Sequence, residues 1–154
     1  MNKLNIGCGN NIKEGYINVD IRKLDDRVIV CDVHDLPFPD EHFDYIYAKD
    51  IIEHVGRLEI NSVLKEWVRV LKKGGEIYFM TLNLQTISKA YLEGKIDARE
   101  ASRMLYGGQD YEYNYHYFCW DEKYAREELE KVGLEVKSIK SRSVQNMEIV
   151  CVKK

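Results

Sequence analysis

The sequence lacks several features that would each assign it to a class of proteins. No apolar run approaches the roughly 20 residues that span a bilayer, and the N-terminal residues show no secretory leader. We therefore expect a cytoplasmic protein without a membrane partner. Lys and Arg total 23 against 26 Asp and Glu, which gives a formal net charge of −3. An excess of acidic residues disfavours binding to duplex nucleic acid.

Cysteine and proline are also scarce. The four cysteines form no C-x-x-C pair and are irregularly spaced, so neither a structural zinc site nor a disulfide framework is expected. With only two prolines, no Ser/Gly-rich linker and no internal repeat, the 154 residues show no domain boundary. We expect a single domain over residues 1–154.

Short apolar runs alternate with amphipathic segments along the chain. The runs predict strands at 4–6, 16–20, 28–31, 43–48, 76–82, 134–141 and 147–152. Helical spacing predicts a helix from Ile60 to Leu71, with Lys72-Lys73 at its end and Gly74-Gly75 as its stop. Two further helices are expected to start at Asp97 and Asp121. This alternation is typical of an α/β layered sheet.

A glycine loop, Gly7-Cys8-Gly9, directly follows the first predicted strand. The third glycine of a dinucleotide fingerprint is absent, since Ile12 stands in its place. The gap between Gly9 and Asp20 is also too short for the usual crossover helix. Phosphates bind at the N-terminus of that helix. Its absence therefore favours a phosphate-free ligand such as S-adenosylmethionine over a dinucleotide.

The order of the motifs extends this interpretation. Between residues 4 and 82, and more loosely over 117–152, the chain resembles the class I S-adenosylmethionine-dependent methyltransferases. The motifs that carry the resemblance are Leu4-Asn5-Ile6-Gly7-Cys8-Gly9-Asn10, Asp20, Cys31-Asp32-Val33-His34-Asp35-Leu36-Pro37-Phe38, Phe43-Asp44-Tyr45-Ile46-Tyr47-Ala48, Ile52-Glu53-His54-Val55 and Leu71-Lys72-Lys73-Gly74-Gly75. The resemblance implies a three-layer Rossmann-like sheet of about seven strands with the last one antiparallel. The N-terminal lid and the first helix of that fold are missing from the pattern.

The same resemblance implies where the cofactor binds. Asp20 corresponds to the residue that holds the ribose hydroxyls, and Asp32 to the one that accepts from the adenine amino group beside the Val33 N–H. Lys49 is either a partner for the cofactor carboxylate or a solvated lysine. The full set of expected cofactor residues is Asn5, Gly7, Cys8, Gly9, Asp20, Ile21, Asp32, Val33, Ala48 and Lys49.

Substrate recognition is expected in an insertion at about residues 84–120. Tyrosines occupy every second position from Tyr111 to Tyr117, a spacing that places them on one face of an extended segment, either as a substrate wall or as ordinary aromatic packing. We expect Asn114 and His116 on the other face, toward the methyl donor. His116 is the candidate general base, with Asp110 or Tyr113 as substitutes.

The short loop is similar to that of a small group of compact methyltransferases associated with polysaccharide biosynthesis. We therefore expect a small-molecule or glycan-precursor acceptor, methylated at oxygen. Asp50, Glu53 and His54 have the spacing of a divalent metal site in some relatives, but we predict no metal. Two alternatives stay open: a non-catalytic S-adenosylmethionine-binding sensor or partner subunit, and a Rossmann module that binds NAD or a nucleotide sugar. The exposed tyrosines would also suit a homodimer surface.

Overall fold

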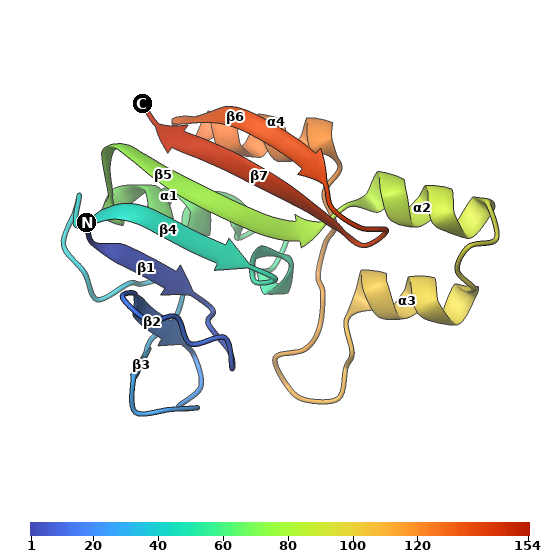
Figure 1. Ribbon diagram of the computed structural model, residues 1–154, viewed down its shortest axis with the longest axis horizontal. Helices are drawn as coiled ribbons and strands as arrows, with labels where there is room; N and C mark the ends of the chain where they lie inside the picture. The colour runs from blue at the N-terminus through green and yellow to red at the C-terminus, as the bar shows by residue number, and fades with distance from the viewer.

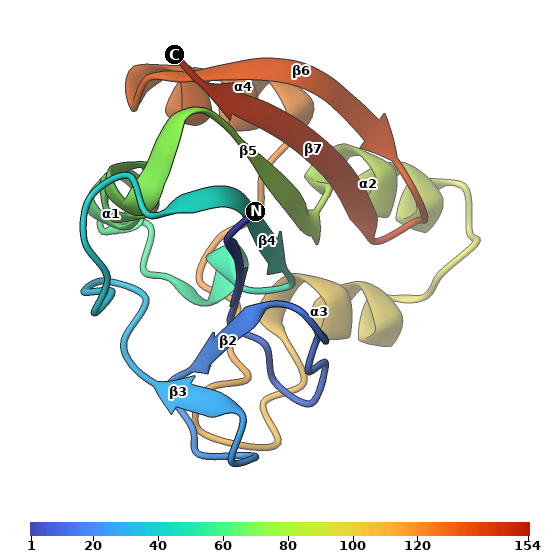
Figure 2. The same ribbon diagram turned by 60° about the vertical axis from the view of Figure 1, so that its left-hand side comes forward.

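A seven-stranded sheet organises the computed structural model, which describes all 154 residues (Figures 1 and 2). The strand order is β3-β2-β1-β4-β5-β7-β6, and β7 runs antiparallel to both of its neighbours while the other pairs are parallel. The strands are β1 (Lys3–Ile6), β2 (Ile17–Asp20), β3 (Val28–Val30), β4 (Phe43–Lys49), β5 (Leu71–Leu82), β6 (Leu134–Ser141) and β7 (Asn146–Lys153). The prediction of about seven strands with the last one antiparallel is confirmed.

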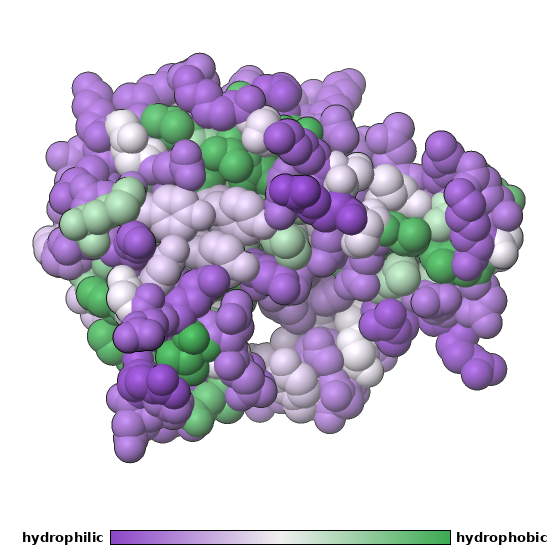
Figure 3. Space-filling view, viewed as in Figure 1, coloured by the Kyte–Doolittle hydropathy of each residue, from purple (hydrophilic) through white to green (hydrophobic).

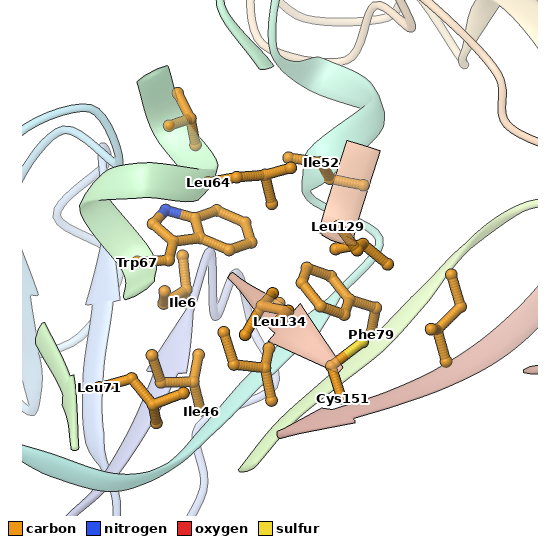
Figure 4. Packing of buried hydrophobic residues seen from close by; sticks show 14 of the residues in the cluster. Ile6, Ile46, Ile52, Leu64, Trp67, Leu71, Phe79, Leu129, Leu134 and Cys151 are labelled. Carbon is orange, nitrogen blue, oxygen red and sulfur yellow. The ribbon is translucent and has the colours of Figure 1, made fainter. Parts of the chain in front are cut away.

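Helices α1 (Ile60–Val70) and α4 (Glu122–Lys131) cover one face of this sheet. The apolar stripe of α1 places Leu64 and Trp67 against the sheet, where Trp67 stacks on Phe79 with ring centroids 6.0 Å apart (Figure 4). Leu129 of α4 joins the same cluster. Burial of these large side chains, each stabilising by about 1.5–3 kcal/mol, fixes the sheet and so the loops at its edge.

The opposite face of the sheet carries no helix (Figure 1). Its side chains include Tyr45, Tyr47 and Tyr78, which alternate along β4 and β5 with buried residues. Tyr47 stacks on Tyr78 at 5.1 Å, and the Lys13 ammonium lies 4.1 Å from the Tyr47 ring centroid. Figure 3 shows this face as a pale band of intermediate hydropathy with hydrophilic surroundings. The three-layer prediction therefore needs correction, because the segments that would supply the second helical layer are short loops.

The loop between β1 and β2 contains only turns, as its length predicted. Two buried asparagines replace the missing helix as its support. The Asn5 amide donates to the side-chain oxygen of Asn18 (2.8 Å) and to the Asn11 carbonyl (2.9 Å). The same Asn18 oxygen accepts from the backbone N–H of Lys13 (2.9 Å). These bonds hold the glycine loop at the carboxyl end of β1.

The end of α1 differs from the prediction. The helix stops at Val70, and Leu71 already begins β5, so Lys72-Lys73 and Gly74-Gly75 belong to the strand. Tertiary donors end the helix in place of a glycine. The Lys153 ammonium donates to the carbonyls of Val68 (2.9 Å) and Leu71 (2.7 Å). Because these carbonyls already have partners, the helix needs no glycine cap.

Between β5 and α4 the chain forms two helices and a loop. Helix α2 (Leu84–Leu92) was not predicted, and the Asn83 side chain caps it by accepting from the Gln85 N–H (3.0 Å). Helix α3 (Ala98–Tyr106) starts at the predicted cap Asp97 and stops at Gly107. The chain then returns along residues 107–117 toward the carboxyl ends of β1 and β2 (Figures 1 and 2).

No helix combines the length and apolar character needed to cross a membrane. The cytoplasmic location stays a prediction.

Candidate functional site

Two adjoining cavities open at the carboxyl ends of β1, β2 and β4, the edge where open α/β sheets bind ligands. One, of about 260 Å³, lies between the ends of β2 and β3, the segment after β4 and the loop 107–117. The other, of about 320 Å³, is polar and lies against the glycine loop. They share Gly7, Arg22, Asp50 and Tyr111. Figure 3 shows the hollow between these segments. The pair forms one cleft with a half-apolar and a polar compartment.

Most of the expected cofactor residues border this cleft. Gly7, Asp20, Ile21, Asp32 and Val33 line the first cavity, and Asn5, Gly7, Cys8, Gly9 and Lys49 line the polar one. The sequence had placed these residues at or next to strand ends, and parallel strands bring such ends together. Ala48 is the exception, because it is buried beneath the cleft and borders neither cavity.

The carboxylate of Asp20 is held by three donors at the end of β2. Its Oδ2 accepts from the Gly9 N–H (2.8 Å), and its Oδ1 accepts from the N–H (3.0 Å) and the Nε (3.2 Å) of Arg22. Only 7% of the Asp20 side chain is exposed. The carboxylate is therefore fixed in orientation, with its remaining acceptor capacity directed at the cleft that it lines.

Asp32 borders the same cavity beyond the end of β3. Its Oδ1 accepts from the backbone N–H of His34 (2.9 Å) and contacts the His34 ring Nδ1 (2.6 Å). Burial would raise the pKa of Asp32, but these hydrogen bonds outweigh it and lower the pKa. The group is thus an ionised acceptor at neutral pH. His34, which the sequence interpretation had not assigned, also lines the cavity.

The segment after β4 turns sharply into a short 3-10 helix, η1 (Ile52–His54). Asp50 has a left-handed backbone (φ 52°), which is uncommon for a residue other than glycine. Glu53 points into the core, where it is 1% exposed and its Oε2 accepts from the Thr81 hydroxyl (3.0 Å). Burial raises the pKa of Glu53 to about 8. Since Glu53 is directed away from the cleft, Asp50, Glu53 and His54 do not form a metal-ligating cluster.

His54 lies on the cleft wall, and its ring Nδ1 contacts the Tyr115 carbonyl (2.9 Å). A carbonyl only accepts, so this contact requires the proton on Nδ1 and leaves Nε2 with its lone pair. Burial is the main cause that lowers the pKa of His54. The imidazole is therefore neutral at pH 7.

The loop 107–117 is irregular rather than extended, with a turn closed by the Asn114 N–H donating to the Tyr111 carbonyl (3.0 Å). Tyr111, Tyr113 and Tyr117 of this loop line the cavity, and Glu112 lines it with them. The expectation that Asn114 and His116 face the methyl donor is wrong, because neither borders the cleft: Asn114 donates to Asp110, and His116 contacts the Met104 carbonyl of α3. The turn breaks the alternation on which that expectation depended.

The three candidate catalytic residues consequently have different positions. Tyr113 is on the cavity wall. His116 lies behind it, with its Nδ1 2.9 Å from the Met104 carbonyl and its ring 4.8 Å from the His54 ring. The Asp110 carboxylate accepts from the Asn114 amide outside the cavity.

Cys8 and Lys49 complete the polar cavity. Burial raises the pKa of Cys8 to about 11, so its thiol is protonated at neutral pH and is no nucleophile. The Lys49 ammonium lies 3.8 Å from Asp50 Oδ2 and keeps 40% of its side chain exposed. Arg22 is the second cation at this cavity. The sequence interpretation missed it because a single arginine two residues after a strand shows no local pattern.

The strand order, the antiparallel β7 and a ligand cleft beside a glycine loop define a Rossmann-like methyltransferase fold. Comparison with known proteins agrees. A family model described as "Methyltransferase domain" matches residues 8–79. A ubiquinone/menaquinone biosynthesis C-methyltransferase, UbiE, of Vibrio parahaemolyticus is 33% identical over 91 residues, which are 53% of this chain and 34% of the relative. The matched segment thus spans about a third of that enzyme.

Solved structures share the fold over nearly the whole chain. A SAM-dependent methyltransferase from Methanosarcina mazei superposes with a TM-score of 0.72 at 19% identity, covering 99% of this chain and 92% of the other. The 1,6-didemethyltoxoflavin-N1-methyltransferase of Burkholderia thailandensis, with bound 1,6-didemethyltoxoflavin and S-adenosylhomocysteine, gives a TM-score of 0.70 at 13% identity. The superposition covers 70% of that enzyme's chain and 99% of this one.

The chain is thus similar to a methyltransferase domain over residues 8–79, and over nearly its whole length it has the fold of S-adenosylmethionine-dependent methyltransferases. S-Adenosylmethionine is the cofactor of this class.

Proposed function

We propose that the chain binds S-adenosylmethionine in the cleft and transfers its methyl group to a small molecule. The observation that carries this proposal is the fixed carboxylate of Asp20 beside a glycine loop that has no helix behind it. A carboxylate is suited to two ribose hydroxyls. The first cavity would take the adenosine, with Asp32 and Val33 at the adenine, and the polar cavity the amino-acid end.

Transfer of a methyl group from a sulfonium is an in-line displacement. The carbon–sulfur bond breaks as the acceptor atom bonds the methyl group, and the sulfonium leaves as a neutral thioether. The protein therefore has to align the acceptor and, for a hydroxyl acceptor, take up one proton. The apolar and aromatic wall made by Ile51, Val55 and the cleft tyrosines suits an acceptor with a flat or apolar part.

For the acceptor we keep the classes that the sequence suggests, a small molecule or a glycan precursor methylated at oxygen. The relatives do not favour one acceptor atom, since one is a C-methyltransferase and another an N1-methyltransferase.

The exposed tyrosines of the loop 107–117 also support a homodimer that forms through this loop. Light scattering on Tyr117→Ser tests this homodimer: the variant should lose a dimer that the wild type forms.

The experiment that tests transfer is the release of S-adenosylhomocysteine on incubation with S-adenosylmethionine and a panel of small hydroxylated acceptors and sugar precursors. We expect acceptor-dependent release. Tight binding of S-adenosylmethionine with no turnover on any acceptor would instead favour the non-catalytic sensor or partner subunit.

Tyr113, His116 and Asp110 remain the candidates for the proton acceptor, and the position of Tyr113 on the cavity wall supports it most directly. We expect Tyr113→Phe to slow single-turnover methyl transfer on the order of 10²-fold, because a general base contributes about 10²–10⁴-fold, with the affinity for S-adenosylmethionine unchanged. Tyr115→Phe is the matched control, since Tyr115 is about as exposed as Tyr113 but borders neither cavity of the cleft. A loss confined to His116→Ala would assign the proton to His116.

A further inference from the structure

Arg22 occupies an acceptor site that a ribose would need. The Asp20 carboxylate accepts about four hydrogen bonds, and three come from the chain: the Gly9 N–H, the Arg22 N–H and the Arg22 Nε. Two ribose hydroxyls require two acceptor positions on the carboxylate, so one of these three donors has to leave. Two are backbone groups of the glycine loop and the β2 end. The Arg22 side chain, 31% exposed, is the donor free to move.

The polar cavity lies within reach of the same guanidinium. Arg22 lines both cavities, and its guanidinium carbon lies 4.8 Å from the Tyr111 ring centroid. Its Nη2 lies 3.8 Å from the position that a Cβ on Gly9 would occupy. The charged end is therefore already over the glycine loop, where no helix N-terminus is present to bind an anion. Arginine binds carboxylates through two parallel hydrogen bonds.

We propose that Arg22 exchanges partners when the ligand enters: the ribose hydroxyls replace its Nε on Asp20, and its guanidinium binds the carboxylate of the same ligand in the polar cavity. This inference rests on the proposed function and adds a specificity-determining residue to it. A ligand that has the ribose but no carboxylate would displace Arg22 without giving it a new anion. The cleft thus selects adenosyl ligands with an anionic tail.

Calorimetric titration of two ligands tests the exchange: S-adenosylhomocysteine and its decarboxylated analogue, which differs only by the carboxylate. We expect the wild type to prefer S-adenosylhomocysteine by at least about 10-fold, the worth of one charge-assisted bond. Arg22→Ala should lose this preference and bind the decarboxylated analogue at least as tightly as the wild type does. Arg22→Gln, which keeps most of the side-chain length but not the charge, should lose the preference in the same way.

Lys49→Ala tests the competing assignment of the carboxylate partner, because Lys49 is the other cation of the polar cavity. We expect it to leave the preference between the two ligands intact. The inference is overturned if Arg22→Ala keeps the preference for S-adenosylhomocysteine, which includes the case in which the affinity for both ligands falls equally. It is also overturned if Lys49→Ala abolishes that preference. Failure of the wild type to bind either ligand would instead reject the proposed function, so the two failures are distinguishable.

Discussion

Gly7→Val is expected to destabilise the fold by about 2–5 kcal/mol, through overpacking and the left-handed backbone. A Cβ at Gly7 would lie 2.5 Å from Cδ1 and Cγ1 of Ile51, and Gly7 has a φ of +61°. Ile51 packs against the core, so a shift of its side chain away from the new Cβ would cost core contacts. The glycine is thus required by the chain's own packing, and not only by the approach of a ligand. Urea unfolding monitored by circular dichroism measures the change.

Gly15→Val is the matched control for this prediction. Gly15 shares the left-handed backbone (φ +74°), but a Cβ there meets nothing within 4 Å. We expect it to show the backbone strain alone, and the difference between the two variants to report the collision with Ile51. Equal destabilisation of both variants would contradict the packing argument. Ile51→Ala combined with Gly7→Val should recover part of the loss.

Glu53→Gln is expected to remove a pH dependence of stability. The raised pKa of about 8 means that the folded state holds Glu53 neutral, while the unfolded state ionises near the ordinary value of 4.5. The stabilisation is complete below pH 4.5 and is lost as the pH rises through about 8. Over that window the free energy of unfolding should fall on the order of 1 kcal/mol per pH unit in the wild type.

Glutamine imitates the neutral acid, and its side-chain oxygen can still accept from the Thr81 hydroxyl. The variant should therefore lack that slope and equal or exceed the wild type in stability at pH 8. Thermal unfolding of both proteins from pH 4 to 9 provides the measurement. Glu14→Gln, at an exposed position, is the control and should keep the wild-type slope. An unchanged slope in Glu53→Gln would show that Glu53 is ionised in the folded state.

The sheet was predictable from the sequence because its strands are short apolar runs, and their order follows from the resemblance. The residues that border the cleft at the strand ends were predictable for a related reason. Residues such as Asp20 and Asp32 end strands, and parallel topology gathers those ends at one edge. Helix α2 could also have been predicted, since an asparagine such as Asn83 is a common N-cap residue.

The remaining features depend on contacts between distant segments. The stop of α1 needs Lys153 from the last strand, and the packing of Gly7 needs Ile51, 44 residues away. The burial of Glu53 depends on Thr81 of β5. In the loop 107–117 the turn between Tyr111 and Asn114 removes the alternation, so that Tyr111, Glu112 and Tyr113 all line the cleft. None of these is encoded in local spacing.

We propose that the cleft takes a phosphate-free adenosyl ligand held by Asp20. Isothermal titration of S-adenosylhomocysteine and of NAD into the wild type and Asp20→Ala tests this binding. We expect one-to-one binding of S-adenosylhomocysteine, a loss of about 1.5–3 kcal/mol in Asp20→Ala, and no binding of NAD. Tighter binding of NAD, or an unchanged affinity for S-adenosylhomocysteine in Asp20→Ala and Asp20→Asn alike, would contradict it.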